Sequence, residues 1–334
     1  MATLTGLGQN SYVRYLKESS YGTAPTMSGA ILLPALDGSA INPERERIKK
    51  DFVSGSRIMK KDALGRYINK FDLELLIAPT LLGDVLAWIH GAASSSGTGA
   101  YVHTYLCAVT GVRQGLSAAV QVAYGSSDSV DQVAGCTVTG YKITGSNNGD
   151  FKMTLHVVGK TASTVSRITT FSYPAVLDYN FSMLDIKVGA ALGSVASVFA
   201  TDMTLDVDLG YNTEEYFFGS ATILQPQYNS IPKVTGSFKI DADTAYWADT
   251  LANTTKAAKF IWTSTDIADG STPFSTTIEI PVLEYDQSTA KKVVSNDRQW
   301  MDIAFTARGG VTTGSPTTAI PFEIQHTDAT ATHT

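Results

Sequence analysis

The stretch MTLDVDLGY, residues 203–211, alternates apolar and polar residues without a break. Its apolar set takes every second position and consists of Met203, Leu205, Val207 and Leu209. Strict alternation with a period of two is typical of a β-strand that has one face in a core. The other face carries Asp206 and Asp208, although Asp is a poor strand former. The stretch therefore predicts a half-buried strand whose acidic face has a role outside the core.

The composition of the whole chain favours a β-rich protein. Its 334 residues are enough for about two domains of roughly 150 residues each. Apolar residues make up 43% of the chain, but charged residues only 17%, against a typical ~25%. Low charge and 28 glycines predict an all-β protein with many turns, or one with large surfaces buried against partners.

Sequence features that direct a chain to a compartment point to the cytoplasm. No apolar run reaches the roughly 18–20 residues needed to span a bilayer, and the opening MATLTGLGQN lacks the features of a signal peptide. We therefore expect a protein made and kept in the cytoplasm, at least until assembly. Cys107 and Cys136 fit a reducing compartment and are expected to be free, buried thiols.

The net charge of −6 is unevenly distributed. Residues 1–165 carry 15 basic and 12 acidic residues, whereas residues 166–334 carry 10 basic and 19 acidic residues. Such asymmetry concerns partners rather than fold. The acidic half argues against tight wrapping of nucleic acid, and the mildly basic half can meet the acidic half of a neighbouring copy.

An internal repeat divides the chain into two halves. Residues 52–88 align without a gap with residues 217–253, and the closing strand 151–160 corresponds to 301–309. A repeat of this size indicates a duplicated domain rather than a solenoid. We expect a first domain at 1–170, a second at 171–315 and a flexible tail at 316–334. Each half reads as a β-sandwich or open barrel of about six to eight strands with one short helix.

Each copy of the repeat predicts a strand followed by a short helix. In the first copy Pro79 and Thr80 open the helix and Gly91 ends it. The apolar stripe at helical spacing consists of Leu81, Leu82, Val85, Leu86 and Ile89. In the second copy the stripe is thinner and consists of Tyr246, Trp247 and Leu251.

The residues do not predict an enzyme. No phosphate-binding loop, dinucleotide fingerprint or nucleophile elbow occurs, and the calcium-loop pattern is absent. His103 and Cys107 share a strand face, but only Cys136 and His156 remain to complete a zinc site, at no recognisable spacing. We therefore expect no catalytic residue, no metal and no cofactor. Asp206 and Asp208 as a hydrolytic carboxylate pair remain an alternative without a supporting motif.

A long charged segment spans residues 37–66. Its basic residues are Arg45, Arg47, Lys49, Lys50, Arg57, Lys60, Lys61 and Arg66, and four acids dilute them from residue 44 onward. Nucleic-acid binding requires aromatic platforms or a purer basic patch. The segment is more typical of a charged loop that docks on another protein subunit.

Several stretches together resemble phage tail tube proteins, more narrowly the long type with two tube domains in one chain. These are YLKESSYGTAP near the N-terminus, residues 52–92, and GCTVTGYKITGSNNGDFKMTLHVVGK, residues 135–160. IPKVTGSFKIDADTAYWADTL, residues 231–251, fits the same pattern in the second half. The resemblance covers most of the chain and rests on composition and position, because the family has no catalytic signature.

The resemblance implies a structural protein of the virion tail that is assembled in the bacterial host cytoplasm. Such proteins are β-sandwiches with a flanking helix, and their inner sheets join into a ring that stacks into a tube for DNA. A two-domain chain is then expected to form a homotrimeric, pseudo-hexameric ring. The implied partners are further copies of the chain, the tape-measure protein, the tail terminator and distal tail proteins.

The resemblance also suggests roles for the charged residues. Acids expected to face the lumen and repel DNA phosphates are Asp206, Asp208, Asp72, Glu74, Asp241 and Asp243. The basic residues of segment 37–66 are expected to reach between rings and set register. The alternatives are a secreted β-sandwich adhesin or carbohydrate-binding module, and a tube subunit of a tailocin, gene transfer agent or secretion machine.

Overall fold

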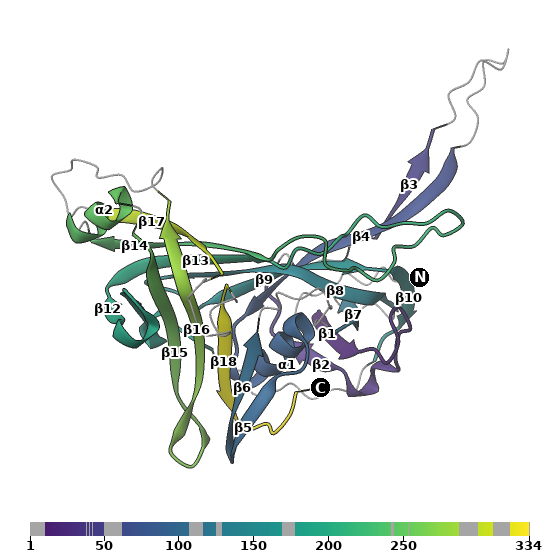
Figure 1. Ribbon diagram of the computed structural model, residues 1–334. Helices are drawn as coiled ribbons and strands as arrows, with labels where there is room; N and C mark the ends of the chain where they lie inside the picture. The colour runs from purple at the N-terminus through teal and green to yellow at the C-terminus, as the bar shows by residue number, and fades with distance from the viewer. Residues whose placement is uncertain are drawn as a thin grey trace.

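The chain is an all-β protein, as the alternating pattern predicted. The computed structural model describes residues 11–37, 39, 41, 43–49, 62–106, 116–124, 129–168, 178–241, 244–252, 254–286, 300–309 and 321–333. Within these residues, eighteen strands join through antiparallel pairs into one hydrogen-bonded network, with two short α-helices (Figure 1). In the described ranges, three single-turn 3-10 helices lie at Met27–Gly29, Phe181–Met183 and Leu192–Ser194.

The first half forms two layers that share one long strand, β8 (Ser129–Ser146). One layer has the order β2–β1–β7–β8–β10, with β1 at Tyr12–Lys17, β2 at Ile31–Leu33, β7 at Ala118–Ala123 and β10 at Thr161–Ser166. The other has the order β3–β4–β9–β8, with β3 at Glu44–Ile48, β4 at Ala63–Leu76 and β9 at Lys152–Gly159.

The second half has the same arrangement around the long strand β16 (Thr272–Tyr285). One layer has the order β12–β11–β15–β16–β18, with β11 at Leu184–Gly189, β12 at Ala196–Val198, β15 at Lys256–Asp269 and β18 at Glu323–Asp328. The other has the order β13–β14–β17–β16, with β13 at Ala200–Asp208, β14 at Lys233–Asp241 and β17 at Trp300–Ala307. The hairpin of β5 (Ser94–Thr98) and β6 (Ala100–Leu106) extends the first of these layers beyond β18.

A strand pair between the halves makes one sheet continuous through the molecule. Residues 140–146 of β8 pair with residues 202–208 of β13. We call the resulting layer the shared sheet; it contains β3, β4, β9, β8, β13, β14, β17 and the end of β16. It forms the upper layer in Figure 1.

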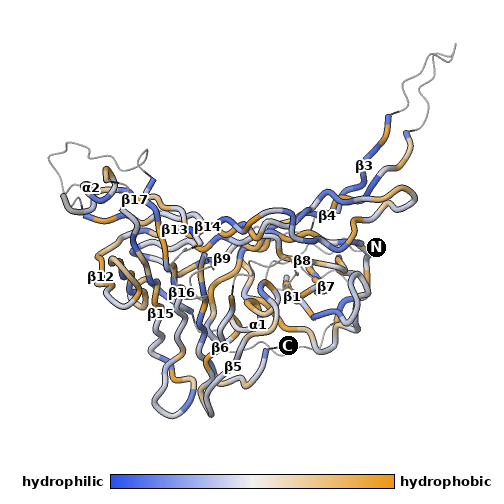
Figure 2. Tube along the Cα trace, viewed as in Figure 1, coloured by the Kyte–Doolittle hydropathy of each residue, from blue (hydrophilic) through white to orange (hydrophobic). Residues whose placement is uncertain are grey.

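Helix α1 (Pro79–His90) fills the core of the first half. Pro79 stands in its first turn and Gly91 ends it with a φ of 88°, a conformation that favours glycine. Trp88 is 1% exposed, stacks on Tyr15 with ring centroids 4.9 Å apart, and donates from Nε1 to the Cys136 carbonyl at 3.2 Å. Figure 2 shows the hydrophobic stretches of β7, β8 and their neighbours around this helix. Helix α2 (Thr244–Leu251) follows β14 as α1 follows β4.

Two sequence-based predictions need correction. The segment 316–334 is not a flexible tail where the structure describes it, because residues 321–333 include β18, which pairs with both β16 and β6. Phe322 and Ile324 are 0% and 1% exposed. The strand was not predicted because most residues around these two apolar positions are small and polar. The charged segment 37–66 is not simply a loop either, since β3 pairs with the start of β4 as an antiparallel ribbon.

Candidate assembly surface

The outer face of the shared sheet collects the acids that the alternating pattern singled out. Beyond the arm its inner face is mainly apolar and buried, so most polar residues of these strands point the other way. The carboxylates on this outer face include Asp72, Glu74, Asp202, Asp206, Asp208, Asp241, Glu284 and Asp302. All the predicted acids are therefore on one face, except Asp243, which lies outside the described residues.

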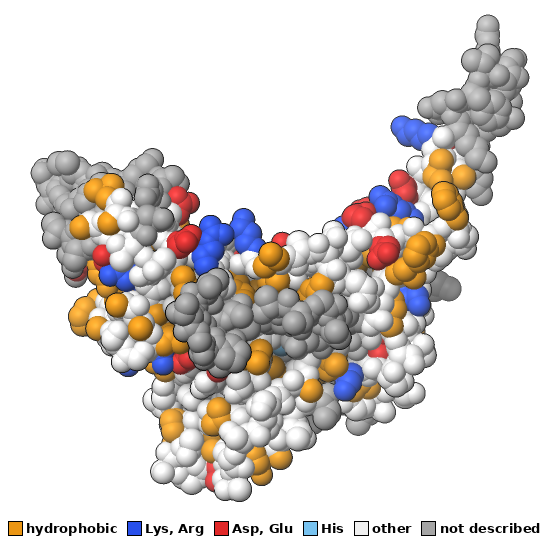
Figure 3. Space-filling model, viewed as in Figure 1, with side chains coloured by type: hydrophobic (Ala, Val, Ile, Leu, Met, Phe, Trp, Pro, Cys, Tyr) orange, Lys and Arg blue, Asp and Glu red, His pale blue; other side chains and the backbone are white. Residues whose placement is uncertain are grey.

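Lysines that the sequence analysis did not consider lie on the same face. They are Lys70, Lys142, Lys152, Lys233 and Lys239. Lys142 is directly opposite Asp206, and Lys233 is directly opposite Asp208. The face is thus a mosaic of both signs with an excess of carboxylates, and red and blue side chains gather along the hollowed upper surface in Figure 3.

Two of the predicted acids have partners of their own. Lys152 Nζ lies 3.3 Å from Glu74 Oε1, and His156 Nδ1 lies 2.8 Å from Asp72 Oδ1. All four side chains are at least one-third exposed, and exposed pairs of this kind contribute about 0–1 kcal/mol to stability. Their effect is to lower the local excess of negative charge rather than to hold the sheet together.

The charged segment forms an arm that projects from the body of the protein (Figure 1). We call β3 with the start of β4, residues 44–48 and 63–68, the arm. All residues of β3 are exposed, and among the described strands β3 pairs only with β4. The predicted contact residues Arg45, Arg47, Lys49 and Arg66 lie on or beside it, whereas Lys50, Arg57, Lys60 and Lys61 lie outside the described residues.

Residues 209–232, between β13 and β14, reach across the first half to the base of the arm. We call them the clasp. The backbone N–H of Leu209 donates to Thr139 on β8 at 3.0 Å, and the hydroxyl of Tyr216 donates to the Tyr67 carbonyl on β4 at 2.7 Å. The backbone N–H of Tyr67 in turn donates to the Ala221 carbonyl at 2.7 Å. The contacts between the second half and the first half therefore extend well beyond the β8–β13 strand pair.

Charge and aromatic contacts reinforce the clasp. Glu214 bonds to Lys70 and lies 3.2 Å from Arg66, and the hydrogen bond from Lys70 contributes most to lowering the pKa of the Glu214 carboxyl. The Arg66 guanidinium lies 5.0 Å from the centroid of the Tyr216 ring. At the outer end Phe217 and Phe218 are 58% and 109% exposed. Large apolar side chains this exposed mark a surface that suits a protein partner.

The candidate metal ligands from the sequence are not brought together. Cys136 is a free, buried thiol as expected, and its Sγ donates to the Val133 carbonyl at 3.3 Å. His156 is on the outer face beside Asp72, and Cys107 lies outside the described residues. His103 has other neighbours, Asp328 and His333, which the sequence analysis left in the tail.

Comparison with known proteins identifies a relationship over most of the chain. A family model described as phage tail tube protein matches residues 8–307. No curated protein matches the chain. None of the helices in the described ranges is long and apolar enough to cross a membrane.

Proposed function

The chain belongs to the phage tail tube protein family, and from that premise we propose that it closes into a ring through the two open edges of its shared sheet. Membership of the family makes it a structural protein of the virion tail. The observation that carries the ring proposal is the β8–β13 strand pair, which already joins two sheet units edge to edge within one chain. Copies of the chain would repeat that joint between molecules.

The common strand order of the halves supports a duplicated tube domain. The unit β3–β4–β9–β8 has the same order and strand directions as β13–β14–β17–β16. We propose domains at residues 1–170 and 171–315 related by duplication, with β18 completing the second. Six such units in three copies close a pseudo-hexameric ring.

Two edges of the shared sheet, at β3 and at the end of β16, have no partner strand among the described residues. By the equivalence of the halves, β3 corresponds to the region of β13 and the end of β16 corresponds to the end of β8. Among the described strands, β3 pairs with β4 alone, and past Leu283 the edge of β16 opposite β17 has no partner strand. Unpaired edges promote association, so the β3 edge of one copy would pair with the β16 end of the next.

The clasp indicates what the arm does in such a ring. Both connect equivalent strands, since the clasp precedes β14 as the arm precedes the rest of β4. The clasp lies across the neighbouring unit, whereas the arm extends away from its own chain (Figure 1). We infer that the arm lies across the second half of the next copy, where its basic residues meet acidic surface. Contact of Lys50, Arg57, Lys60 and Lys61 with the adjacent ring stays a prediction.

The outer face of the shared sheet would then line the lumen. Its excess of carboxylates repels DNA phosphates, and its lysines opposite Asp206 and Asp208 are held near counter-charges rather than presented as a basic patch. DNA would pass without strong adhesion. We propose assembly in the bacterial host cytoplasm, with the tape-measure, terminator and distal tail proteins as partners. A tube of a tailocin or gene transfer agent would use the same surfaces.

Cysteine cross-linking of purified assemblies tests the proposed edges. Glu44 is on β3, and Glu284 and Asp286 are at the end of β16, two residues apart and therefore on one face. Opposite residues in a ladder have Cα atoms about 4.5–5.5 Å apart, within disulfide reach. Two double variants, Glu44→Cys with Glu284→Cys and Glu44→Cys with Asp286→Cys, test two alignments of β3 against the end of β16 that differ by two residues. One of them should give covalent trimers on oxidation.

Each cross-linking outcome bears on the proposal. The control pairs Glu44→Cys with Glu279→Cys, because Glu279 is opposite Lys259 inside the chain; it and the single variants should give no trimer. Rings or tubes in negative stain without cross-linking in either double variant would contradict the edge assignment. A persistent monomer in the unmodified protein would contradict self-assembly itself.

A further inference from the structure

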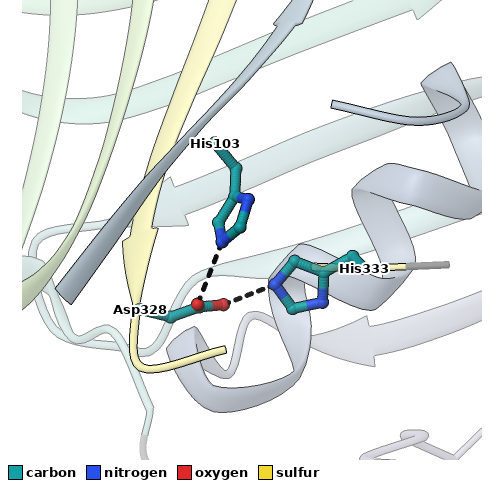
Figure 4. A group of neighbouring side chains, drawn as sticks. All are labelled: His103, Asp328 and His333. Carbon is teal, nitrogen blue, oxygen red and sulfur yellow. Dashed lines mark hydrogen bonds and ion pairs between the residues drawn. The ribbon is translucent and has the colours of Figure 1, made fainter. Parts of the chain in front are cut away.

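Three histidines and one aspartate meet in the interior beside the C-terminal strand. Figure 4 shows His103, His333 and Asp328 of this cluster. His103 comes from β6, His326 and Asp328 from β18, and His333 from the segment after β18. His103 and His326 are 0% exposed, Asp328 is 1% exposed and His333 is 6% exposed. The ligand atoms of His103, Asp328 and His333 all lie within 4.8 Å of one another.

All three histidines direct the same ring atom, Nε2, at the carboxylate of Asp328. The Nε2 atom of His103 lies 3.2 Å from Oδ1, and that of His333 lies 2.7 Å from Oδ2. The Nε2 atom of His326 lies 3.4 Å from Oδ2, but without hydrogen-bond geometry, and it has no hydrogen-bond partner. A buried polar atom left in this way costs about 1–3 kcal/mol, so the protein chain alone does not satisfy the cluster.

The other ring nitrogen of each histidine, Nδ1, lies within hydrogen-bond distance of a side-chain oxygen. The Nδ1 atom of His103 is 2.8 Å from Ser95 Oγ, that of His326 is 2.9 Å from Thr276 Oγ1, and that of His333 is 2.7 Å from Asp84 Oδ1. Binding a metal through Nε2 requires that atom to lose its hydrogen, and these three oxygens can then accept the hydrogen that each ring carries on Nδ1. This is the outer-shell arrangement that orients metal-binding histidines.

We propose that His103, His326, His333 and Asp328 form a structural zinc site. Imidazole nitrogens and a carboxylate oxygen are ligands that zinc takes. His103, Asp328 and His333 already have ligand atoms close together, and the Nε2 atom of His326, 3.4 Å from Asp328 Oδ2, would move toward the ion to complete a tetrahedral set. The ion gives the Nε2 atom of His326 the partner that it lacks. His103 Nε2, which donates to the Thr330 carbonyl at 2.8 Å in the metal-free arrangement, gives up that bond on coordination.

Helix α1 is shaped to receive His333. A Cβ atom on Gly83 would lie 2.2 Å from His333 Nε2, so only glycine leaves room for the imidazole ring. Glycine in a helix interior costs about 1 kcal/mol relative to alanine. Helix α1 thus provides the space for His333 at Gly83, and the adjacent Asp84 accepts a hydrogen bond from its ring.

The site joins segments that are distant in sequence. The hairpin β5–β6 and α1 belong to the first half, whereas His326 and Asp328 lie on β18 of the second half and His333 follows that strand. A bound ion links these segments, and its binding free energy adds to that of folding because the unfolded chain does not hold the ligands together. Zinc would therefore stabilise the subunit rather than catalyse a reaction.

Direct metal measurements on the full-length protein test the site. Chelator-treated protein titrated with zinc chloride should bind one ion per chain and melt at a higher temperature after binding. Cobalt(II) in place of zinc should give the visible absorption of a tetrahedral site. His326→Asn keeps a polar group near Thr276 but removes Nε2, and it should weaken zinc binding by more than the 10–100-fold typical of outer-shell changes.

A matched substitution and an outer-shell substitution separate coordination from general damage. His156→Asn changes an exposed histidine on the outer face of the shared sheet, and it should leave stoichiometry and affinity unchanged. Asp84→Asn should weaken zinc binding 10–100-fold while the circular dichroism spectrum stays the same. Equal zinc binding by the unmodified protein and His326→Asn, or binding without a rise in melting temperature, would show an adventitious ion only and overturn the proposal.

Discussion

His90, at the end of α1, is a histidine that the fold keeps neutral. Its ring packs edge-on against Tyr141 and Phe322, each with centroids 5.7 Å away, and its Nε2 lies 3.3 Å from the Tyr141 hydroxyl. Burial lowers the pKa of His90 to about 3. The unfolded chain has the ordinary histidine pKa of about 6.5, so protonation favours the unfolded state.

We expect His90 to make stability decline with acid over a defined range. Above the unfolded pKa of about 6.5 both states are neutral there, and between about 6.5 and 3 only the unfolded state takes up the proton. The free energy of unfolding should fall by about 1.4 kcal/mol per pH unit in that window from this group. Denaturant unfolding from pH 7 to pH 5 measures it. His90→Gln should flatten the slope, and an unchanged slope would contradict the assignment.

Single residues were predictable from the sequence only where one strand determines them. The alternation at 203–211 was enough to place Asp206 and Asp208 on a face opposite the core. It could not reveal Lys142 and Lys233 beside them, because strand pairing brings those residues in from β8 and β14. Nor could it unite His103 with Asp328, which meet through the β6–β18 pair.

At the scale of elements, the arm and the clasp contrast most clearly. They occupy equivalent positions in the two halves, yet the clasp is anchored at Tyr67 and the arm exposes Ile48 and Leu64, which are 52% and 57% accessible. An apolar pair on an extended ribbon is unfavourable in water and favourable against a neighbour. The arm therefore has the surface of an element that completes its contacts in an assembly.

Reversing charge in the segment 49–61, which connects the two strands of the arm, should block assembly more than folding. We expect the combined change of Lys49, Lys50, Lys60 and Lys61 to Glu to abolish tubes, because basic residues would no longer meet acidic surface on another copy. The melting temperature should change little. Negative-stain microscopy and thermal unfolding measure both effects. Lys17→Glu, on an exposed residue of β1, is the control, and normal tubes from the fourfold variant would exclude these four lysines from assembly.

The sequence predicted some helices and strands accurately and missed others. The helix at Pro79–His90 begins and ends at the residues that Pro79 and Gly91 predicted, since capping is local. The last strand was missed because its period-two pattern, Phe322 and Ile324 followed by His326 and Asp328, uses polar residues at two buried positions. Their burial depends on partners that only the folded chain brings together.

At the scale of the whole molecule, the shared sheet turns two similar halves into one body. The largest group of buried apolar residues includes members of both halves, such as Leu73 and Phe305. The strand order of the second half repeats that of the first. What the repeat could not predict is the β8–β13 joint, because duplicated units could equally have folded apart.

Replacing acids on the outer face should affect DNA passage and not tube formation. We expect Asp206→Lys with Asp208→Lys to leave tubes intact, because both side chains point away from the core, and to slow DNA release by converting a mixed face into a basic one. Ejection kinetics of virions carrying the variant measure the effect. Asp266→Lys with Asp269→Lys, exposed at the far end of β15, is the control. Normal ejection by the first pair would remove these residues from the lumen.

The position of β18 between β16 and β6 also sets the timing of biosynthesis. Residues 101–106 pair with residues 323–328, so the β5–β6 hairpin must wait on the ribosome for more than two hundred residues before its partner strand emerges. Pairings this distant in sequence form late. A chain released before β18 is synthesised would leave the β6 edge of that hairpin unpaired. We therefore expect assembly to require a subunit in which β18 is present.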